Sequence, residues 1–154
     1  MTIRKATLAD LPPLAGLFDQ YRVFYKKKPD REAAQSFLKD RIVKNESEVF
    51  VSFNDKGVMT GFVQLYPLYS STRMMRLWLL NDLFVHADHR GMGFSIGLIE
   101  RAKTLCRETG ACGMMLETEK SNGVGNRLYP KTGFVLDAGH NYYEWSVAPS
   151  EEKN

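Results

Sequence analysis

A glycine-rich turn between a strand pattern and a helix pattern is the feature that most constrains how this chain can fold. The apolar run 83–85 leads into the turn 90–95, and a helical pattern follows the turn to about residue 109. One face of that helix carries its apolar residues, which are Leu98, Ile99, Ala102, Leu105 and Cys106. A strand that passes directly into an amphipathic helix indicates a fold in which helices pack against a sheet.

The same turn has the properties of an anion site. Backbone N–H groups converge at such a turn, and the helix dipole adds positive potential. Gly91 and Gly93 let the backbone approach a phosphate, and Arg90 adds forked donors with a permanent charge. It is neither a Walker loop nor a dinucleotide-binding loop, because no Gly-Lys-Ser/Thr follows and the glycines stand at 91, 93 and 97. The residues alone leave open a phosphate or pyrophosphate site and an ordinary strand-to-helix turn.

Hydrophobic periodicity along the chain predicts a mixed α/β domain with one central sheet. Strands are expected at 3–6, 48–53, 58–66, 73–85, 114–118, 134–136 and 142–147. Helices are expected at 11–25, from 30 to about 42, 94–109 and 122–131. Residues 54–57 favour a hairpin turn, and Pro67 is expected to weaken the end of the strand before it.

Length and composition indicate one globular domain. The chain has 154 residues, of which 44% are hydrophobic and 25% charged, so wholesale disorder is excluded. We expect a single domain over residues 1–150 and a frayed tail at 151–154. A net charge of +3 is too small to favour nucleic acid as a partner.

Membrane, secretory and metal-binding classes are not favoured either. The longest apolar runs fall well short of the ~18 residues that a membrane helix needs, and the N-terminus lacks the apolar segment of a signal peptide. Cys106 and Cys112 lack C-x-x-C spacing and complete no paired ligand set with His86 and His89, so we expect no metal. These features predict a cytoplasmic protein in a reducing compartment.

A second segment contains a tyrosine at a distinctive position. It reads Asn122-Gly-Val-Gly125-Asn-Arg-Leu-Tyr129-Pro-Lys-Thr-Gly133-Phe134 and is expected to form a short helix. Tyr129 lies one to two turns from the start of that helix. Taken alone, the pattern also fits a tyrosine whose ring packs in the core with its hydroxyl at the rim.

Together the two segments resemble the GNAT N-acetyltransferase superfamily. Its members carry an Arg/Gln-x-x-Gly-x-Gly/Ala turn after the fourth strand, which this chain matches at 90–95 with Ser95 in the last position. They also carry an Asn…Tyr-x-x-x-Gly-Phe pattern, which residues 122–134 match. The opening 3–10 looks like a family N-terminus. Asn81-Asp82 looks like the diamine, polyamine and histone-type branch, where Glu-Asp is common.

The resemblance implies a GNAT-like fold, with a mostly antiparallel sheet of about seven strands, a splayed strand pair and about four helices. It also implies acetyl-CoA as the acyl donor, a small-molecule amine as the acceptor, no metal, and a homodimer. The residues that it assigns to coenzyme binding are Leu83, Phe84, Val85, Arg90, Gly91, Met92, Gly93, Phe94, Ser95 and Asn122. The strand part would hold the pantetheine arm through backbone groups, and the turn would hold the pyrophosphate.

The resemblance also implies catalytic roles. Tyr129 matches the family's general acid, which protonates the departing thiolate. Asp82 is a candidate general base for an acceptor ammonium with a pKa of about 10.4, and Glu117 is a second candidate. Asp82, Glu117 and Tyr25 are the expected acceptor-binding residues. Two alternatives stay open: a carboxylate that only pairs with a cation, and loss of the amine proton to solvent.

Three functions are compatible with these residues. The first is acetyl transfer to a small cationic amine, such as a diamine, a polyamine or a lysine-like molecule. The second is acetyl transfer to a protein lysine or N-terminus. The third is coenzyme A binding without catalysis, which Asn81 and Ser95 leave open because they depart from the family pattern.

Overall fold

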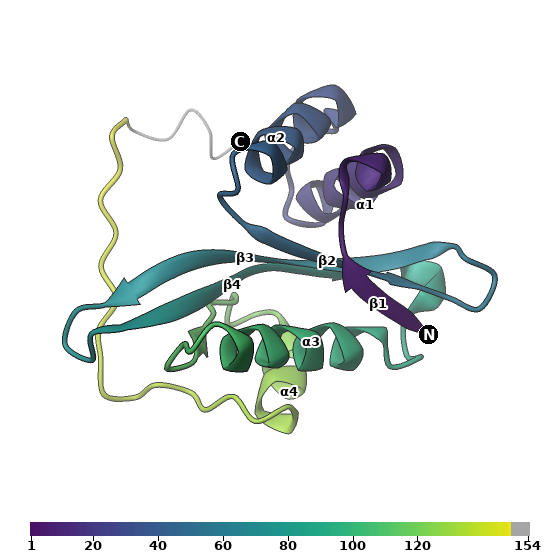
Figure 1. Cartoon of the computed structure of the whole chain (residues 1–154). Coiled ribbons are helices and arrows are strands. Elements are labelled where there is room, and N and C mark those ends of the chain that lie inside the picture. The colour runs from purple at the N-terminus through teal and green to yellow at the C-terminus, as the bar shows by residue number, and fades with distance from the viewer. Residues whose placement is uncertain (149–154) are drawn as a thin grey trace. The chain divides into compact units, whose positions relative to one another are not determined.

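The computed structural model of the chain describes residues 1–148, which form two compact units divided after Glu117 (Figure 1). The first unit contains β1 (Thr2–Lys5), α1 (Leu11–Phe24), α2 (Arg31–Val43), β2 (Glu48–Phe53), β3 (Met59–Ser70), β4 (Met75–Val85), α3 (Phe94–Glu108) and β5 (Met114–Met115). The second unit, which begins at Thr118, contains α4 (Gly123–Lys131). The expected domain end at 150 and the expected tail at 151–154 lie outside the described residues.

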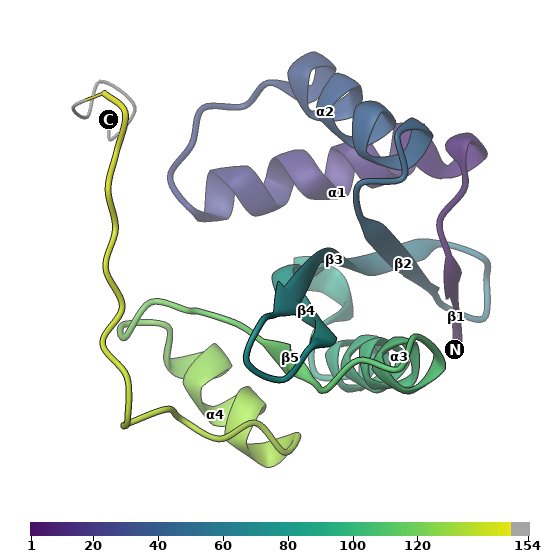
Figure 2. The same ribbon diagram turned by 60° about the vertical axis from the view of Figure 1, so that its left-hand side comes forward.

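The first unit is a sheet between two layers of helix. Its strands lie in the order β1-β2-β3-β4-β5; the first four are antiparallel to their neighbours, and β5 is parallel to β4. Helices α1 and α2 cover one face of the sheet and α3 covers the other, which Figures 1 and 2 both show. The mixed α/β class and the four helices are therefore confirmed over residues 1–148.

A β-bulge in β4 decides which side chains meet on each face. Gln64 lies opposite Asp82 and Leu65 lies opposite Leu80, so Asn81 is an extra residue in β4. Side chains alternate between the faces of a strand. The extra residue therefore places Asp82 on the same face as Gln64, whereas Leu80 shares the other face with Leu65.

The α1 face of the sheet carries a continuous apolar core. Phe62 of β3 and Phe84 of β4 contact the aromatic side of α1, with the Phe18 ring 6.0 Å from that of Phe62. The buried residues of this core are Ala6, Leu11, Leu14, Leu17, Phe18, Ala34, Leu38, Val49, Val51, Phe62 and Phe84. This packing fixes α1 against β3 and β4, close to the bulge.

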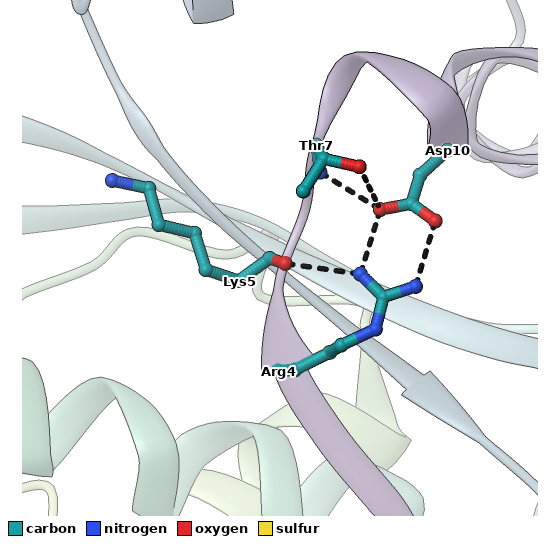
Figure 3. A network of polar contacts seen from close by, with 4 residues as sticks. All are labelled: Arg4, Lys5, Thr7 and Asp10. Carbon is teal, nitrogen blue, oxygen red and sulfur yellow. Dashed lines mark hydrogen bonds and ion pairs between the residues drawn. The ribbon is translucent and has the colours of Figure 1, made fainter.

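An ion pair joins β1 to the start of α1 (Figure 3). Arg4 Nη1 and Nη2 donate to the two oxygens of Asp10 at 2.8 and 2.9 Å. The Thr7 backbone N–H donates to the same carboxylate at 2.8 Å. The hydrogen bonds from Arg4 are the main reason that the pKa of Asp10 is lowered to about 2.

We expect Asp10→Asn to destabilise the protein by about 1–2 kcal/mol at pH 7, because the folded state favours the ionised carboxylate. A depressed pKa adds stability above the unfolded pKa of about 3.9, and this contribution is lost as the pH falls toward 2. Urea unfolding should therefore show the full difference at pH 7 and only about a third of it at pH 2.5, because the folded pKa is about 2. Asp55→Asn, which changes an exposed carboxylate, is the matched control. A difference at pH 2.5 that is as large as the difference at pH 7 would contradict the electrostatic explanation.

The expectation of about seven strands was wrong for the described residues, which form five. Residues 134–136 and 142–147 join no ladder, and their apolar side chains Val135, Leu136, Tyr142, Tyr143, Trp145 and Val147 are exposed. A strand exists only where its backbone N–H and C=O groups pair with a neighbour, and alternating residues do not supply that neighbour. For the same reason, the strand expected at 114–118 pairs with β4 only at Met114 and Met115.

The end of β3 also differs from the expectation, because the strand continues past Pro67 to Ser70. The pairing of β2 with β3 ends at Leu65, while Pro67 pairs with Trp78 of β4. Beyond Leu65 the strand β3 has a neighbour on one side only. A proline fits there because it supplies no N–H to a ladder, and a free edge needs none.

Candidate active site

The glycine-rich turn opens α3 with no side chain capping it among the described residues. Gly91 and Gly93 have φ values of 75° and 87°, so both occupy the left-handed region that favours glycine. Gly93 is the N-cap of α3, and a Cβ there would meet only the Met1 side chain, at 3.8 Å. The first N–H groups of a helix have no intrahelical partner, so the turn presents amides and a helix dipole to an anion.

The side chains of the turn have separate roles. Arg90 Nε donates to the Val85 carbonyl oxygen at 3.0 Å, and its guanidinium lies 5.5 Å from the Phe84 ring. Met92 is exposed, whereas the Phe94 ring is buried. An anion at this turn would therefore meet backbone amides and the Arg90 charge, while Phe94 anchors the helix start.

The strands β4 and β5 separate beside this turn. Their parallel pairing consists of Trp78 with Met114 and Leu79 with Met115. Within the described part of the chain, β4 therefore has no β5 partner from Leu80 to Val85, although it stays paired with β3. Leu83, Phe84 and Val85 lie in this stretch, where backbone groups that point away from β3 have no partner on β5; the Val85 carbonyl oxygen accepts from Arg90 instead.

Asp82 lies at the bulge, nearly buried at 4% exposure. Gln64 Nε2 donates to its Oδ2 at 2.6 Å, and Asn81 Nδ2 donates to its Oδ1 at 2.9 Å. Ser47 Oγ donates to Gln64 Oε1 at 2.8 Å, which fixes the orientation of the Gln64 amide. The carboxylate is therefore held by donors on both oxygens.

Burial raises the pKa of Asp82, and hydrogen bonds from Gln64, Tyr21 and Asn81 offset part of that increase. A carboxylate whose pKa is raised toward the working pH is a better general base than an ordinary surface acid. Asp82 therefore has a fixed position and a raised pKa, and both suit a general base.

Tyr21 brings α1 to the same bulge. Its hydroxyl donates to the Asn81 carbonyl oxygen at 3.3 Å. Tyr25, one helical turn further along, is half-buried with its ring 5.0 Å from that of Tyr21. Glu117 is exposed two residues beyond the end of β5. Of the expected acceptor-binding residues, Tyr25 is therefore linked to the Asp82 region through Tyr21.

An open hollow of about 500 Å³ lies between α2 and β3. Phe37, Arg41, Glu46, Tyr66 and Pro67 line it. Burial, and next the nearby charge of Asp82, raise the pKa of Tyr66 to about 12. The electrostatic effect of Asp82 therefore reaches this hollow.

The second motif forms α4, as expected. Asn122 caps it: its Oδ1 accepts from the Gly125 N–H at 3.1 Å, and its Nδ2 donates to Thr118 Oγ1 at 2.9 Å. A Cβ at Gly125 would lie 2.6 Å from Asn122 Nδ2, so glycine leaves room for the cap. Tyr129 is half-buried, with its ring edge-on to Phe134 at 5.7 Å.

The model of the acetyltransferase (GNAT) family matches residues 14–134. The chain belongs to this family. It is 38% identical over 143 residues to an uncharacterised N-acetyltransferase, YhfO, of Bacillus subtilis, covering 93% of this chain and 95% of that protein. The crystal structure of a probable acetyltransferase superposes with a TM-score of 0.92 at 34% identity, covering 97% of this chain and 100% of the other.

A third relative has a named acceptor. The ribosomal-protein-alanine N-acetyltransferase of Brucella melitensis biovar Abortus is 25% identical, with a TM-score of 0.77, covering 94% of this chain and 100% of that protein. As a GNAT member, this chain is an N-acetyltransferase, and the acyl donor of the family is acetyl-CoA.

The part of this GNAT chain that the structure describes has neither a cluster of metal ligands nor a helix suited to span a membrane. Across residues 1–148, no group of three or more His, Cys, Asp or Glu side chains is placed to hold a metal ion. In the same range, no helix is both long and apolar enough to cross a membrane.

Three residues of the Asp82 region in this GNAT chain were not predicted from the sequence, namely Ser47, Gln64 and Tyr21. Gln64 is fully buried within the apolar run 61–65. A polar residue in such a run indicates a hydrogen-bonding partner in the core, so the sequence could have pointed to it. Ser47 and Tyr21 carry no comparable signal, because each depends on a contact that only the fold makes.

Proposed function

We propose that this enzyme transfers the acetyl group of acetyl-CoA to the primary amine of a small cationic acceptor, by direct attack in a ternary complex. The observation that carries the proposal is the carboxylate of Asp82, fixed at the β4 bulge beside the strand stretch that β5 leaves unpaired. A negative group there attracts an ammonium and can take its proton. The unpaired stretch offers backbone donors and acceptors to the donor arm.

The coenzyme is proposed to bind through the backbone. The pyrophosphate would lie over residues Arg90 to Ser95, where the uncapped start of α3 and the two left-handed glycines support anion binding. The pantetheine arm would pair with the free side of 83–85. A backbone N–H of this stretch would also stabilise the oxyanion that develops on the thioester carbonyl.

The catalytic roles follow from the chemistry of each group. Asp82 is proposed as the general base, and Tyr129, through its family motif, as the acid that protonates the leaving thiolate. Asn122 supports Tyr129 by capping α4. Glu117 and Tyr25 are proposed to contact the acceptor.

Residues 1–150 are proposed to be the acetyltransferase domain, and the family resemblance also supports a cytoplasmic homodimer. Light scattering at two protein concentrations tests the oligomeric state: a mass near twice that of the 17.6 kDa chain is expected. A mass equal to one chain at both concentrations would contradict the dimer.

An acceptor panel tests the proposed function. Release of free thiol from acetyl-CoA is measured with diamines, polyamines, lysine analogues and peptides, and the highest kcat/KM is expected with a small diamine or polyamine. The similarity to a ribosomal-protein-alanine N-acetyltransferase supports a peptide N-terminus as the second candidate, so turnover with peptides alone would favour it. Tight coenzyme binding without turnover on any acceptor would contradict both.

We expect Asp82→Asn to slow transfer in a pH-dependent way. Without a base, reaction depends on the neutral fraction of an amine of pKa about 10.4, which limits the loss to about 250-fold at pH 8 and about 25-fold at pH 9. Rate profiles from pH 7 to pH 10 for the best acceptor measure this convergence. Asp40→Asn on exposed α2 is the control. A loss that stays constant with pH would mean that Asp82 holds the structure or the acceptor without taking a proton.

A further inference from the structure

The Asp82 carboxylate has three hydrogen-bonding partners, and only one of them can pass a proton. Gln64 and Asn81 contact it through amide N–H groups, which do not exchange protons with a carboxylate near neutral pH. The third partner is the Tyr21 hydroxyl, which both donates and accepts. A carboxylate that is 4% exposed therefore has one hydroxyl among its hydrogen-bonding partners.

The side of Asp82 that Gln64 contacts is closed. Gln64 is 0% exposed and Ser47, behind it, is 7% exposed. The Ser47 hydroxyl donates to Gln64, so the amide separates it from the carboxylate. A proton that entered from this side would have to cross an amide, so the route through the core is excluded on chemical grounds.

The Tyr21 ring is fixed so that its hydroxyl stays at the bulge. It is stacked on Phe18 at 6.1 Å, and it meets Phe62 at 6.0 Å and Phe84 at 6.2 Å in edge contacts. The hydroxyl hydrogen is shared between the Asn81 carbonyl at 3.3 Å and the Asp82 carboxylate. Tyr21 is half-buried, and the oxygen lone pairs of its hydroxyl can accept a hydrogen bond from an incoming ammonium.

We propose that Tyr21 relays the proton of the acceptor ammonium to Asp82. The inference rests on the proposed role of Asp82 as general base. In one concerted step, an N–H bond of the ammonium breaks and its proton binds the Tyr21 oxygen, while the original Tyr21 proton moves to Asp82. The products are a neutral amine, an unchanged tyrosine and a protonated Asp82, so charge and atoms balance.

Other ionisable groups lie near this relay. They are Tyr25 on α1 and Tyr66 on β3, together with Arg41 and Glu46, which act on Tyr66. The pKa of Tyr66 is about 12, so this phenol stays neutral over the pH range of an assay. A pH-dependent change in the Tyr21 variant therefore does not come from Tyr66.

A double-mutant cycle tests the relay. Tyr21→Phe keeps the ring and its aromatic contacts, and it is expected to lose as much rate as Asp82→Asn, up to about 250-fold at pH 8. The loss should shrink about tenfold for each pH unit, because the neutral amine becomes abundant. The double variant should be no slower than Asp82→Asn alone, because both groups act in one step. Tyr69→Phe, the same change on an exposed part of β3, is the control.

The outcomes separate this inference from the proposed function. Wild-type activity with a slow Asp82→Asn and a normal Tyr21→Phe would overturn the relay and leave the function standing, whereas inactive wild type with every amine would overturn both. Losses that multiply in the double variant, or a loss that is constant with pH, would also overturn the relay. If Tyr21→Phe lowers the melting temperature, the test instead uses a variant with difluorotyrosine at position 21. Its lower phenol pKa should then change the pH–rate profile, and an unchanged profile would contradict the relay.

Discussion

A Tyr129→Phe variant is expected to transfer acetyl groups about 10²–10⁴ times more slowly than wild type, which is the usual contribution of a general acid. Phenylalanine keeps the ring and its contact with Phe134 but has no proton for the leaving thiolate. Coenzyme affinity and melting temperature should stay close to the wild-type values. Single-turnover kinetics with the best acceptor measure the effect on the chemical step.

The opposite result identifies Tyr129 as a packing residue. In that case activity would survive, or any loss would follow a fall in melting temperature. Tyr143→Phe makes the same chemical change at an exposed position of the same unit, so it controls for effects of losing a phenol. A poorer leaving group in the acyl donor should widen the gap between wild type and Tyr129→Phe, since acid catalysis matters more there.

A Gly93→Val variant is expected to bind coenzyme A about 10²–10⁴ times more weakly. Valine is strained by about 1–3 kcal/mol at a φ of 87°, and the turn must rearrange to relieve it. Rearrangement also removes charge-assisted hydrogen bonds, each worth about 1.5–3 kcal/mol. These losses together correspond to the expected change in affinity. Isothermal titration calorimetry with coenzyme A measures it.

Gly57→Val is the matched control for Gly93→Val. Gly57 has a φ of 77° in the hairpin turn before β3, and no atom lies within 4 Å of its Cβ position. Both variants should therefore lose similar stability, and only Gly93→Val should lose affinity. Equal affinities in the two variants would show that the pyrophosphate does not bind over this turn.

Features that depend on neighbouring residues were predictable from the sequence. The helix starts expected at 30 and 122 are both present, and there the side chains of Asp30 and Asn122 accept from the N–H groups of Ala33 and Gly125. The hairpin at 54–57 and the left-handed glycines of the turn are equally local. Each of these follows from one or two turns of chain, where spacing alone decides the geometry.

Features that depend on distant partners were not predictable. Gln64 reaches Asp82 across 18 residues, and Tyr21 reaches Asn81 across 60. The sequence shows Asn81-Asp82 as a polar interruption, but the position of Asp82 on the α1 face follows from its register with β3. The segment 142–147 alternates like a strand and 134–136 is apolar throughout, yet such patterns state only that a segment suits a sheet.

Because of the bulge at Asn81, the face of the sheet on which Asp82 lies depends on the number of residues in β4 as well as on their types. Deleting Leu83 while keeping the pairing of Phe84 with Phe62 and of Leu80 with Leu65 would place Asp82 opposite Val63, so its side chain would turn toward α3 although the carboxylate itself is retained. Divergence by insertion or deletion can thus remove the base from an acetyltransferase that still carries the complete motif. When relatives are aligned, a gap placed one residue away from its true position compares Asp82 with a side chain from the opposite side of the sheet.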